Sequence, residues 1–180
     1  MTTRRAAFLA AAALLASFAA PPLGAQGGAR WTVFDSPTGR FRAAFPGPPL
    51  RKEGKLRTEI GEVHSVRHTA DDAEATYDVA YNDYPAAGVA KLRPEKLLDT
   101  VRDGLVYQAK GSLAGEKPFR MGKVSGRDLE IAGGDGTRYL VRMFLVGTRL
   151  YQLTALARPP AKPDIDRFFD SFQLTGFTPP

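Results

Sequence analysis

The sequence predicts an α+β fold in which a mainly antiparallel sheet of about six to seven strands carries two principal helices. Three observations predict it. Apolar and polar residues alternate along several short segments, apolar residues recur at helical spacing in two others, and Gly, Pro and Asp residues separate the segments at turn positions. The expected order of elements, β-β-β-β-α-β-β-β-α, implies antiparallel pairing with the helices packed on the faces of the sheet.

Residues 1–25 have the organisation of a secretory signal peptide. Arg4 and Arg5 precede an uninterrupted run of small and apolar residues, Ala6 to Ala20, which Pro21 ends. The run is shorter than the roughly 20 residues that cross a bilayer as a helix. We therefore expect cleavage after Ala25, and an exported protein located in the periplasm or the extracellular space.

Two export routes stay open. The general secretory route fits the whole segment, while the adjacent arginines before Phe8-Leu9 also resemble a twin-arginine signal, with a spacing that is slightly too long. Because the chain contains no cysteine, lipoprotein anchoring, disulfides and cysteine metal sites are excluded. Beyond the signal, no apolar run is long enough for a transmembrane segment.

Residues 26–180 suffice for one domain, which at this size buries about two-thirds of the surface of its chain. The signal peptide holds two of the 25 basic residues and none of the 19 acidic ones, so the mature domain keeps a mild positive excess. Without disulfides, the hydrophobic core alone must hold this domain together.

Four strands are expected before the first helix. Pro46-Gly47-Pro48-Pro49 separates the first pair from the second, because proline cannot donate a hydrogen bond to a neighbouring strand. Tyr77, Val79 and Tyr81 share one face of the fourth strand, and Asp71-Asp72 lies at the turn before it. The expected strands are Trp31–Phe34, Phe41–Phe45, residues 56–70 and residues 75–83, and a loop follows from Asn82 to Val89.

The first principal helix begins at Pro94, because proline is favoured at the first helical position. An apolar stripe defines its buried face and outweighs Gly104, which costs about 1 kcal/mol relative to alanine. Gly111 stands where a C-terminal cap is expected. The stripe consists of Leu97, Leu98, Val101, Leu105 and Ala109.

Two hairpins follow, and side-chain pairing predicts their registers. A three-residue loop, Gly134 to Gly136, places Asp128 opposite Arg142, whereas a two-residue loop would place Glu130 opposite Tyr139. The longer loop satisfies the apolar and the charged pairs together, so we prefer it. It pairs Ile131 with Tyr139 and Leu129 with Val141, and a type II′ turn at Gly147-Thr148 then pairs Phe144 with Tyr151, Leu145 with Leu150, and Val141 with Thr154.

Both faces of the second hairpin carry large apolar residues, so both faces should be covered. The second principal helix is expected from Pro163 to Phe172, with Asp164 and Asp166 at its positive N-terminal end. Phe168 and Phe172 should be buried against the sheet. The apolar stripe of this helix consists of Ile165, Phe168, Phe169 and Phe172.

Four segments carry a family resemblance: the strand from Gly39 to Pro46, the strand start Gly126 to Glu130, the strand Arg149 to Leu153 and the closing helix Phe168 to Phe172. In these segments, and over residues 31–174, the chain resembles the PsbP-like α/β/α sandwich. The family includes the extrinsic PsbP subunit of photosystem II, a eukaryotic Ran-binding import factor of similar fold and many uncharacterised exported bacterial proteins. These shared motifs are packing motifs, so the resemblance implies a non-enzymatic accessory or binding domain and carries over no photosystem role.

The two histidines, His64 and His68, lie close to the turn carboxylates Asp71 and Asp72 and to Glu74. On a strand, four positions span about 13 Å, which is too far for two imidazoles to share one zinc ion. We therefore interpret both as surface histidines on one strand face, and we expect no metal and no cofactor. If a metal did bind, one histidine and the turn carboxylates would hold it.

No nucleophile motif supports catalysis. The segment Gly122 to Gly126, around Ser125, has the wrong spacing for a nucleophile elbow, and Gly133 to Gly136 lacks the Lys-Ser/Thr pair of a P-loop. Our leading hypothesis is an exported, non-catalytic binding or accessory module. The alternative is an exported hydrolase with an unrecognised site near His64 and His68.

A basic segment is the candidate binding site. Arg51, Lys52, Lys55 and Arg57 follow the proline turn, and only Glu53 opposes them within the segment. Like charge concentrated without obvious pairing indicates an anionic partner, either a protein or an envelope component, and peripheral membrane contact is compatible with it. The other interpretation is a solvated loop. We expect no nucleic acid partner outside the cytoplasm.

Overall fold

The computed structural model describes residues 30–159, 161 and 163–176. Within these residues the fold is α+β, with a large amount of strand and little helix. The strands are β1 (Thr32–Ser36), β2 (Phe41–Phe45), β3 (Leu50–Thr58), β4 (Gly61–Asp71), β5 (Ala75–Asp83), β6 (Ser112–Met121), β7 (Val124–Ala132), β8 (Arg138–Val146), β9 (Arg149–Ala157) and β10 (Gln173–Leu174). The helices are α1 (Ala86–Val89), α2 (Pro94–Gln108) and α3 (Ile165–Asp170).

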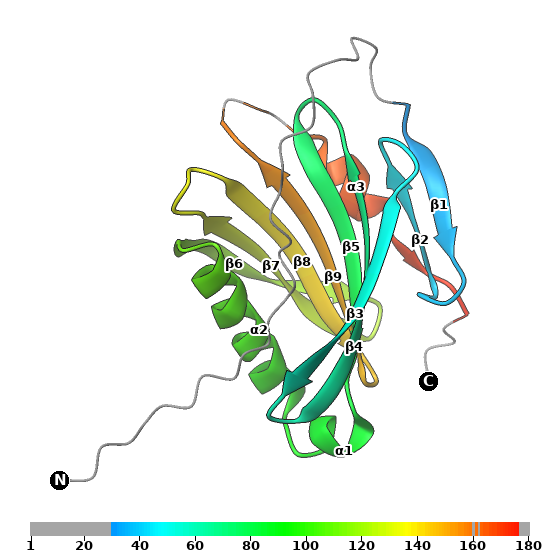
Figure 1. Cartoon of the computed structure of the whole chain (residues 1–180), viewed down its shortest axis with the longest axis vertical. Coiled ribbons are helices and arrows are strands. Elements are labelled where there is room, and N and C mark those ends of the chain that lie inside the picture. The colour runs from blue at the N-terminus through cyan, green and yellow to red at the C-terminus, as the bar shows by residue number, and fades with distance from the viewer. Residues whose placement is uncertain (1–29, 160, 162, 177–180) are drawn as a thin grey trace, which may run out of the picture.

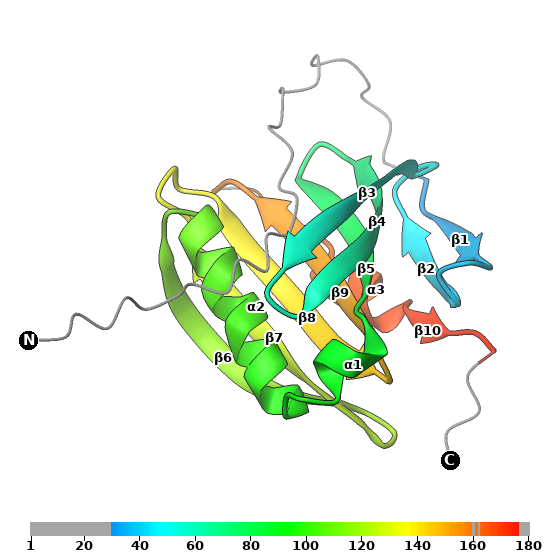
Figure 2. The same cartoon turned by 60° about the horizontal axis from the view of Figure 1, so that its bottom comes forward.

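Seven strands form one antiparallel sheet in the order β3-β4-β5-β9-β8-β7-β6, and β1, β2 and β10 form a smaller one (Figure 1). Helix α2 lies across one face of the larger sheet, over β6, β7 and β8 (Figure 2). The smaller sheet and α3 cover the opposite face. This second layer therefore combines strands with a helix of only six residues, where the sequence led us to expect a second principal helix.

Each face of the larger sheet carries its own hydrophobic core. The β8–β9 hairpin serves both, because Leu150 joins the core beneath α2 while Tyr151 joins the core beneath the smaller sheet. The expectation that both of its faces are covered is confirmed. Phe168 and Phe172 are also buried as predicted. The core beneath α2 is built around Leu97, Leu98, Val101, Leu105, Leu129, Ile131, Val141 and Met143, and the opposite core around Phe41, Phe45, Tyr77, Phe144, Phe168 and Phe172.

The predicted registers of both C-terminal hairpins are confirmed. Asp128 lies opposite Arg142, and the two side chains form a bidentate pair with distances of 2.8 and 2.9 Å. Arg138 likewise contacts Glu130. The apolar pairs also match, with Ile131 opposite Tyr139, Leu129 opposite Val141, Phe144 opposite Tyr151, Leu145 opposite Leu150, and Val141 opposite Thr154.

Two expectations about strands were wrong. The segment 56–70 is not one strand, because the chain turns at residues 59–60 and Gly61 adopts a φ of +118° that favours glycine. The result is a hairpin of β3 and β4. Strand β6 was not predicted at all, since a bulge between Leu113 and Gly115 and the proline at position 118 interrupt the alternation that marks a strand.

The connections around the helices also differ from expectation. The expected loop from Asn82 to Val89 contains the last part of β5 and the short helix α1. At the end of α2, the residue with a positive φ is Lys110, at 47°, and not Gly111. Glycine is required at 111 for another reason: a Cβ there would lie 1.9 Å from the carbonyl oxygen of Ala132.

Candidate partner-binding site

The four basic residues singled out from the sequence lie on β3, at one edge of the seven-stranded sheet. Most of the nine residues of β3 are exposed. Because side chains alternate along a strand, Arg51, Lys55 and Arg57 point to the side of the smaller sheet, and Lys52 points to the side of α2. The segment is thus a regular edge strand rather than a solvated loop, and its positive charge is divided between two faces.

Two of the four cations have partners, so the expectation of unpaired charge holds for only part of the segment. Arg51 donates to Glu53 at 2.6 Å, and Lys55 contacts Glu62 on the neighbouring strand at 2.8 Å. These hydrogen bonds raise the pKa of Arg51 and of Lys55, and the bond from Lys55 lowers the pKa of Glu62. Both pairs are largely exposed, so each contributes little to stability.

Lys52 and Arg57 are the cations that remain available to a partner. Neither forms an ion pair within the described residues, although Arg57 lies opposite Glu62 in the register and helps to lower its pKa. Lys52 lies directly opposite Arg67, and like charges across a strand pair are unfavourable.

Next to Lys52 lies a buried polar group that sequence reasoning missed. Arg67 on β4 contacts Asp78 on β5 at 3.4 Å, and the hydroxyl of Thr69 donates to the same carboxylate at 2.8 Å. Burial raises the pKa of Asp78, while Arg67 and Thr69 act in the opposite direction. The signal in the sequence was a carboxylate between Tyr77 and Val79 in the middle of an apolar strand. Its partners satisfy it, which identifies the group as part of the framework behind the β3 edge.

The two histidines share one face of β4, as expected, but only one of them is a surface residue. The side chain of His64 is 45% exposed, and its Nε2 lies 3.9 Å from Glu53. His68 is 2% exposed and lies among Phe34, Phe41 and Tyr81. Burial, together with the charge of Arg51, lowers the pKa of His68 to about 4. The interpretation of His68 as a surface residue was wrong, because β1 and β2 cover that end of the sheet.

Neither histidine lies near Ser125, the serine that the sequence offered as a possible nucleophile. Ser125 lies on β7, and three strands separate β7 from β4 in the sheet, a distance of about 19 Å at the usual strand spacing. Ser65 is nearer in sequence but lies on the opposite face of β4 from His64. Among the described residues, no group of three or more His, Asp or Glu side chains is placed to hold a metal ion. None of the helices described is long and apolar enough to span a membrane.

Within residues 30–159, 161 and 163–176, the seven-stranded sheet has two edges without a neighbouring strand, and they differ in their ability to accept another strand. Strand β6 forms one edge, and its bulge and Pro118 disturb the regular row of backbone groups that another strand would need. Strand β3 forms the other edge and pairs with β4 over all nine residues without a bulge. No proline interrupts β3. Of the two edges, β3 is therefore the one that can accept an additional strand.

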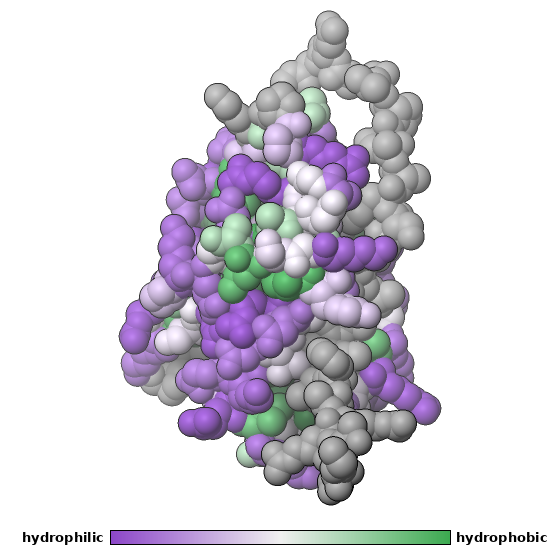
Figure 3. Space-filling model, turned by 90° about the vertical axis from the view of Figure 1, so that its left-hand side faces the viewer, coloured by the Kyte–Doolittle hydropathy of each residue, from purple (hydrophilic) through white to green (hydrophobic). Residues whose placement is uncertain are grey.

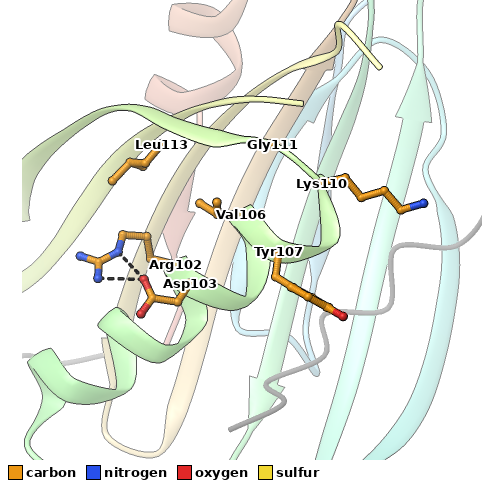
Figure 4. Close-up of a pocket in the computed structure, with 7 residues that line it drawn as sticks. All are labelled: Arg102, Asp103, Val106, Tyr107, Lys110, Gly111 and Leu113. Carbon is orange, nitrogen blue, oxygen red and sulfur yellow. Dashed lines mark hydrogen bonds and ion pairs between the residues drawn. The ribbon is translucent and has the colours of Figure 1, made fainter. Parts of the chain in front are cut away.

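A shallow hollow lies near the edge of the sheet opposite to β3, where the end of α2 meets the start of β6 (Figure 4). Its apolar lining comes from Val106, Tyr107 and Leu113, while Arg102, Asp103 and Lys110 supply charge around it. On this side of the molecule a group of hydrophobic residues is surrounded by hydrophilic ones (Figure 3). Sequence reasoning missed this surface because it assigned no strand to residues 112–121.

Comparison with known proteins identifies the architecture. A solved structure, cyanobacterial PsbP (CyanoP) from Synechocystis sp. PCC 6803, superposes with a TM-score of 0.55, covering 86% of this chain and 99% of that one at 12% sequence identity. The fold is PsbP-like. No protein-family profile and no curated protein sequence matches the chain. The PsbP-like fold agrees with the resemblance found in the sequence, and at this identity the likeness concerns the fold alone.

Proposed function

We propose that this protein is an exported, non-catalytic accessory module, formed by a single domain of residues 26–180, that binds a protein partner along the edge strand β3. The observation that carries the proposal is the uninterrupted, exposed edge of β3 with two cations, Lys52 and Arg57, that have no ion-pair partner among the described residues. The PsbP-like fold supports it, since the extrinsic PsbP subunit is itself an accessory protein.

Binding would combine two contributions. An extended segment of the partner would add to the sheet through backbone hydrogen bonds along β3, which provide affinity without requiring a pocket. Acidic side chains of the partner would meet Lys52 and Arg57, which raises the encounter rate and fixes the register. The acidic chemistry also fits an anionic envelope component, but an uninterrupted strand edge favours a polypeptide.

Charge reversal tests the electrostatic contribution. We expect Lys52→Glu/Arg57→Glu to abolish crosslinks between this protein and its partner in the native cell envelope, because both unpaired cations of the edge become acidic. The matched control is Lys91→Glu/Arg120→Glu, which changes the net charge equally at exposed positions away from β3. Crosslinking with mass spectrometry reads the result. Equal crosslink yields for the two double variants would contradict the proposal.

Proline substitution tests the backbone contribution. In an antiparallel pair, consecutive residues point their N–H groups alternately toward the neighbouring strand and away from it. Of Lys52→Pro and Glu53→Pro, one therefore removes a hydrogen bond to β4, and the other obstructs only the outer edge. We expect the variant that keeps the native melting temperature to lose the partner. If that variant still binds, then an added strand is not the mode of recognition.

A further inference from the structure

The backbone of β3 offers free hydrogen-bonding groups at alternate residues, and the register of the β3–β4 hairpin shows which residues these are. Thr58 and Gly61 pair across a turn of two residues, 59–60. The pair that closes a two-residue hairpin is hydrogen-bonded, and hydrogen-bonded and non-hydrogen-bonded pairs alternate from there. Because the register reaches Leu50 without a shift, every second residue of β3 directs its N–H and C=O away from β4. The residues concerned are Arg51, Glu53, Lys55 and Arg57.

These outward backbone groups are available to another strand. Among the described residues, none of the four makes a backbone hydrogen bond to any other element, and all four are exposed. An added strand would therefore pair with them in the same alternating pattern that joins β3 to β4. The positions of its residues along β3 are then fixed, and each of its side chains points to the same face of the sheet as the β3 side chain directly opposite.

The two cations without an ion pair in the described chain set the spacing of the charges that a partner needs. Lys52 and Arg57 lie five positions apart, so they point to opposite faces of the sheet. Two acidic residues of an added strand can meet both cations only if they too are five positions apart. At a spacing of four, both acidic residues would share one face, and the one that follows Arg57 would meet Glu53.

The start of β3 adds an apolar requirement. Leu50 is 63% exposed, although large hydrophobic side chains are normally removed from water where a surface is covered. It lies two positions from Lys52 and therefore on the same face. All neighbouring strands of this sheet pair antiparallel, and a partner that continues this arrangement runs from Arg57 toward Leu50.

We infer that the β3 edge selects an extended segment in which an acidic residue, four intervening residues, a second acidic residue, one intervening residue and an apolar residue follow in this order. The first acidic residue meets Arg57, the second meets Lys52, and the apolar residue covers Leu50. This inference rests on the function proposed for β3 and adds the chemistry of the partner. A second copy of β3 does not meet the requirement, because the strand contains a single acidic residue, Glu53.

The spacing is tested with a peptide that carries it and a control of the same composition. The probe is the fluorescein-labelled peptide Glu-Val-Thr-Thr-Thr-Glu-Thr-Val, titrated with the exported protein and followed by fluorescence anisotropy. In the control, Glu-Val-Thr-Thr-Glu-Thr-Thr-Val, the acidic residues are four positions apart. Both can then meet cations only at Arg51 and Lys55, which already have partners. We expect the control to bind roughly fivefold more weakly, because it gains no contact with an unpaired cation.

Charge exchange tests the register itself. We expect Lys52→Glu to weaken binding of the probe roughly threefold, and lysine at the sixth residue of the peptide should restore it. Lysine at the first residue should not. Arg57→Glu is the matched variant, for which only lysine at the first residue should restore binding. Both cations are exposed, so both variants should keep the native melting temperature.

The outcomes separate this inference from the function on which it rests. Equal binding of the two peptides overturns the inferred spacing, and so do the absence of binding by both and restoration by lysine at the wrong residue. None of these results changes the crosslinks to the native partner, by which the proposed function is judged. Glu53→Pro likewise tests the edge alone, because it removes an N–H that points away from β4.

Discussion

At the scale of the single residue, His68 illustrates how the smaller sheet changes the chemistry of a strand. Its ring centroid lies 5.0 Å from that of Phe34 and 5.4 Å from that of Phe41, and both of these phenylalanines belong to the layer formed by β1 and β2. Its Nδ1 atom has no hydrogen-bond partner within the part of the chain that the structure describes. An imidazole in such surroundings is stable only when neutral, because no anion is present among its ring neighbours to offset a positive charge.

The free energy of unfolding should therefore decrease as the pH is lowered through a defined window. The pKa of His68 is lowered from 6.5 to about 4, so between these values the unfolded state binds a proton that the folded state excludes. The part of the stability that depends on a neutral His68 is fully present above pH 6.5 and is lost as the pH falls toward about 4. Over this range the free energy of unfolding changes by up to about 1.4 kcal/mol per pH unit. Urea denaturation at several pH values measures the free energy of unfolding across the window.

The matched variants isolate this contribution from that of the carboxylates, which also titrate in acid. His68→Leu should flatten the pH dependence between pH 6.5 and about 4 relative to the native protein. His64→Leu replaces the more accessible histidine on the same strand face, whose side chain is 45% exposed, and should retain the native slope. A native slope in His68→Leu would show that the buried imidazole is not the titrating group.

The sequence revealed the shared face of the two histidines but not their difference in burial. Alternation along β4 is a local property, and it correctly places His64 and His68 on one side of the strand. Whether a position on that side is covered depends on β1 and β2, which are distant in the chain. The pairing of Lys55 with Glu62 became visible only once β3 and β4 were in register. Arg51 and Glu53 are two positions apart on β3, so their pairing followed once residues 50–58 were recognised as a strand.

At the scale of the element, local pairing rules succeeded where the strands are regular and failed where they are interrupted. The hairpin of β7 and β8 was predictable because only one register satisfies Asp128 and Arg142 together with the apolar pairs. Strand β6 escaped detection because its bulge shifts the alternation and Pro118 argues against a strand. Strands β3 and β4 were merged because their turn at residues 59–60 carries no strong turn signature.

Helix α3 is short, so its attachment depends on the aromatic residues that it carries into the core. Phe172 follows the helix and lies 5.5 Å from Phe41, 5.7 Å from Phe144 and 5.8 Å from Tyr151, measured between ring centroids. It thereby joins the smaller sheet to the larger one. Shortening the Phe172 side chain removes contacts to both sheets at once. The strands on either side are rigid and cannot approach each other to fill the cavity that remains.

We expect Phe172→Ala to lower the free energy of unfolding by about 3–5 kcal/mol. Denaturant unfolding followed by circular dichroism measures the change. Phe119→Ala is a useful comparison, because Phe119 is only partly buried at the edge strand β6 and should cost less. A loss below about 1 kcal/mol for Phe172→Ala would mean that the C-terminal segment contributes little to the core.

At the scale of the whole molecule, the β3 edge and the hollow beside α2 lie at opposite ends of one sheet. Strand β3 is the first strand in the sheet order and β6 is the last, and α2 stands beside β6 (Figure 2). A polypeptide bound along the β3 edge would therefore leave the surface around α2 uncovered.

The proposed export would set the compartment in which these contacts occur, and this proposal rests on residues 1–25, which lie outside the described residues. Their charged start, apolar run and closing Pro21-Pro22 predict cleavage after Ala25. We expect the exported protein to begin at Gln26, as N-terminal sequencing of material recovered outside the cytoplasm would show. Arg4→Lys/Arg5→Lys separates the two routes, because the general route needs only positive charge here and the twin-arginine route needs the arginines themselves. An exported protein that still begins at Thr2 would contradict the signal peptide and leave the apolar run as an anchor.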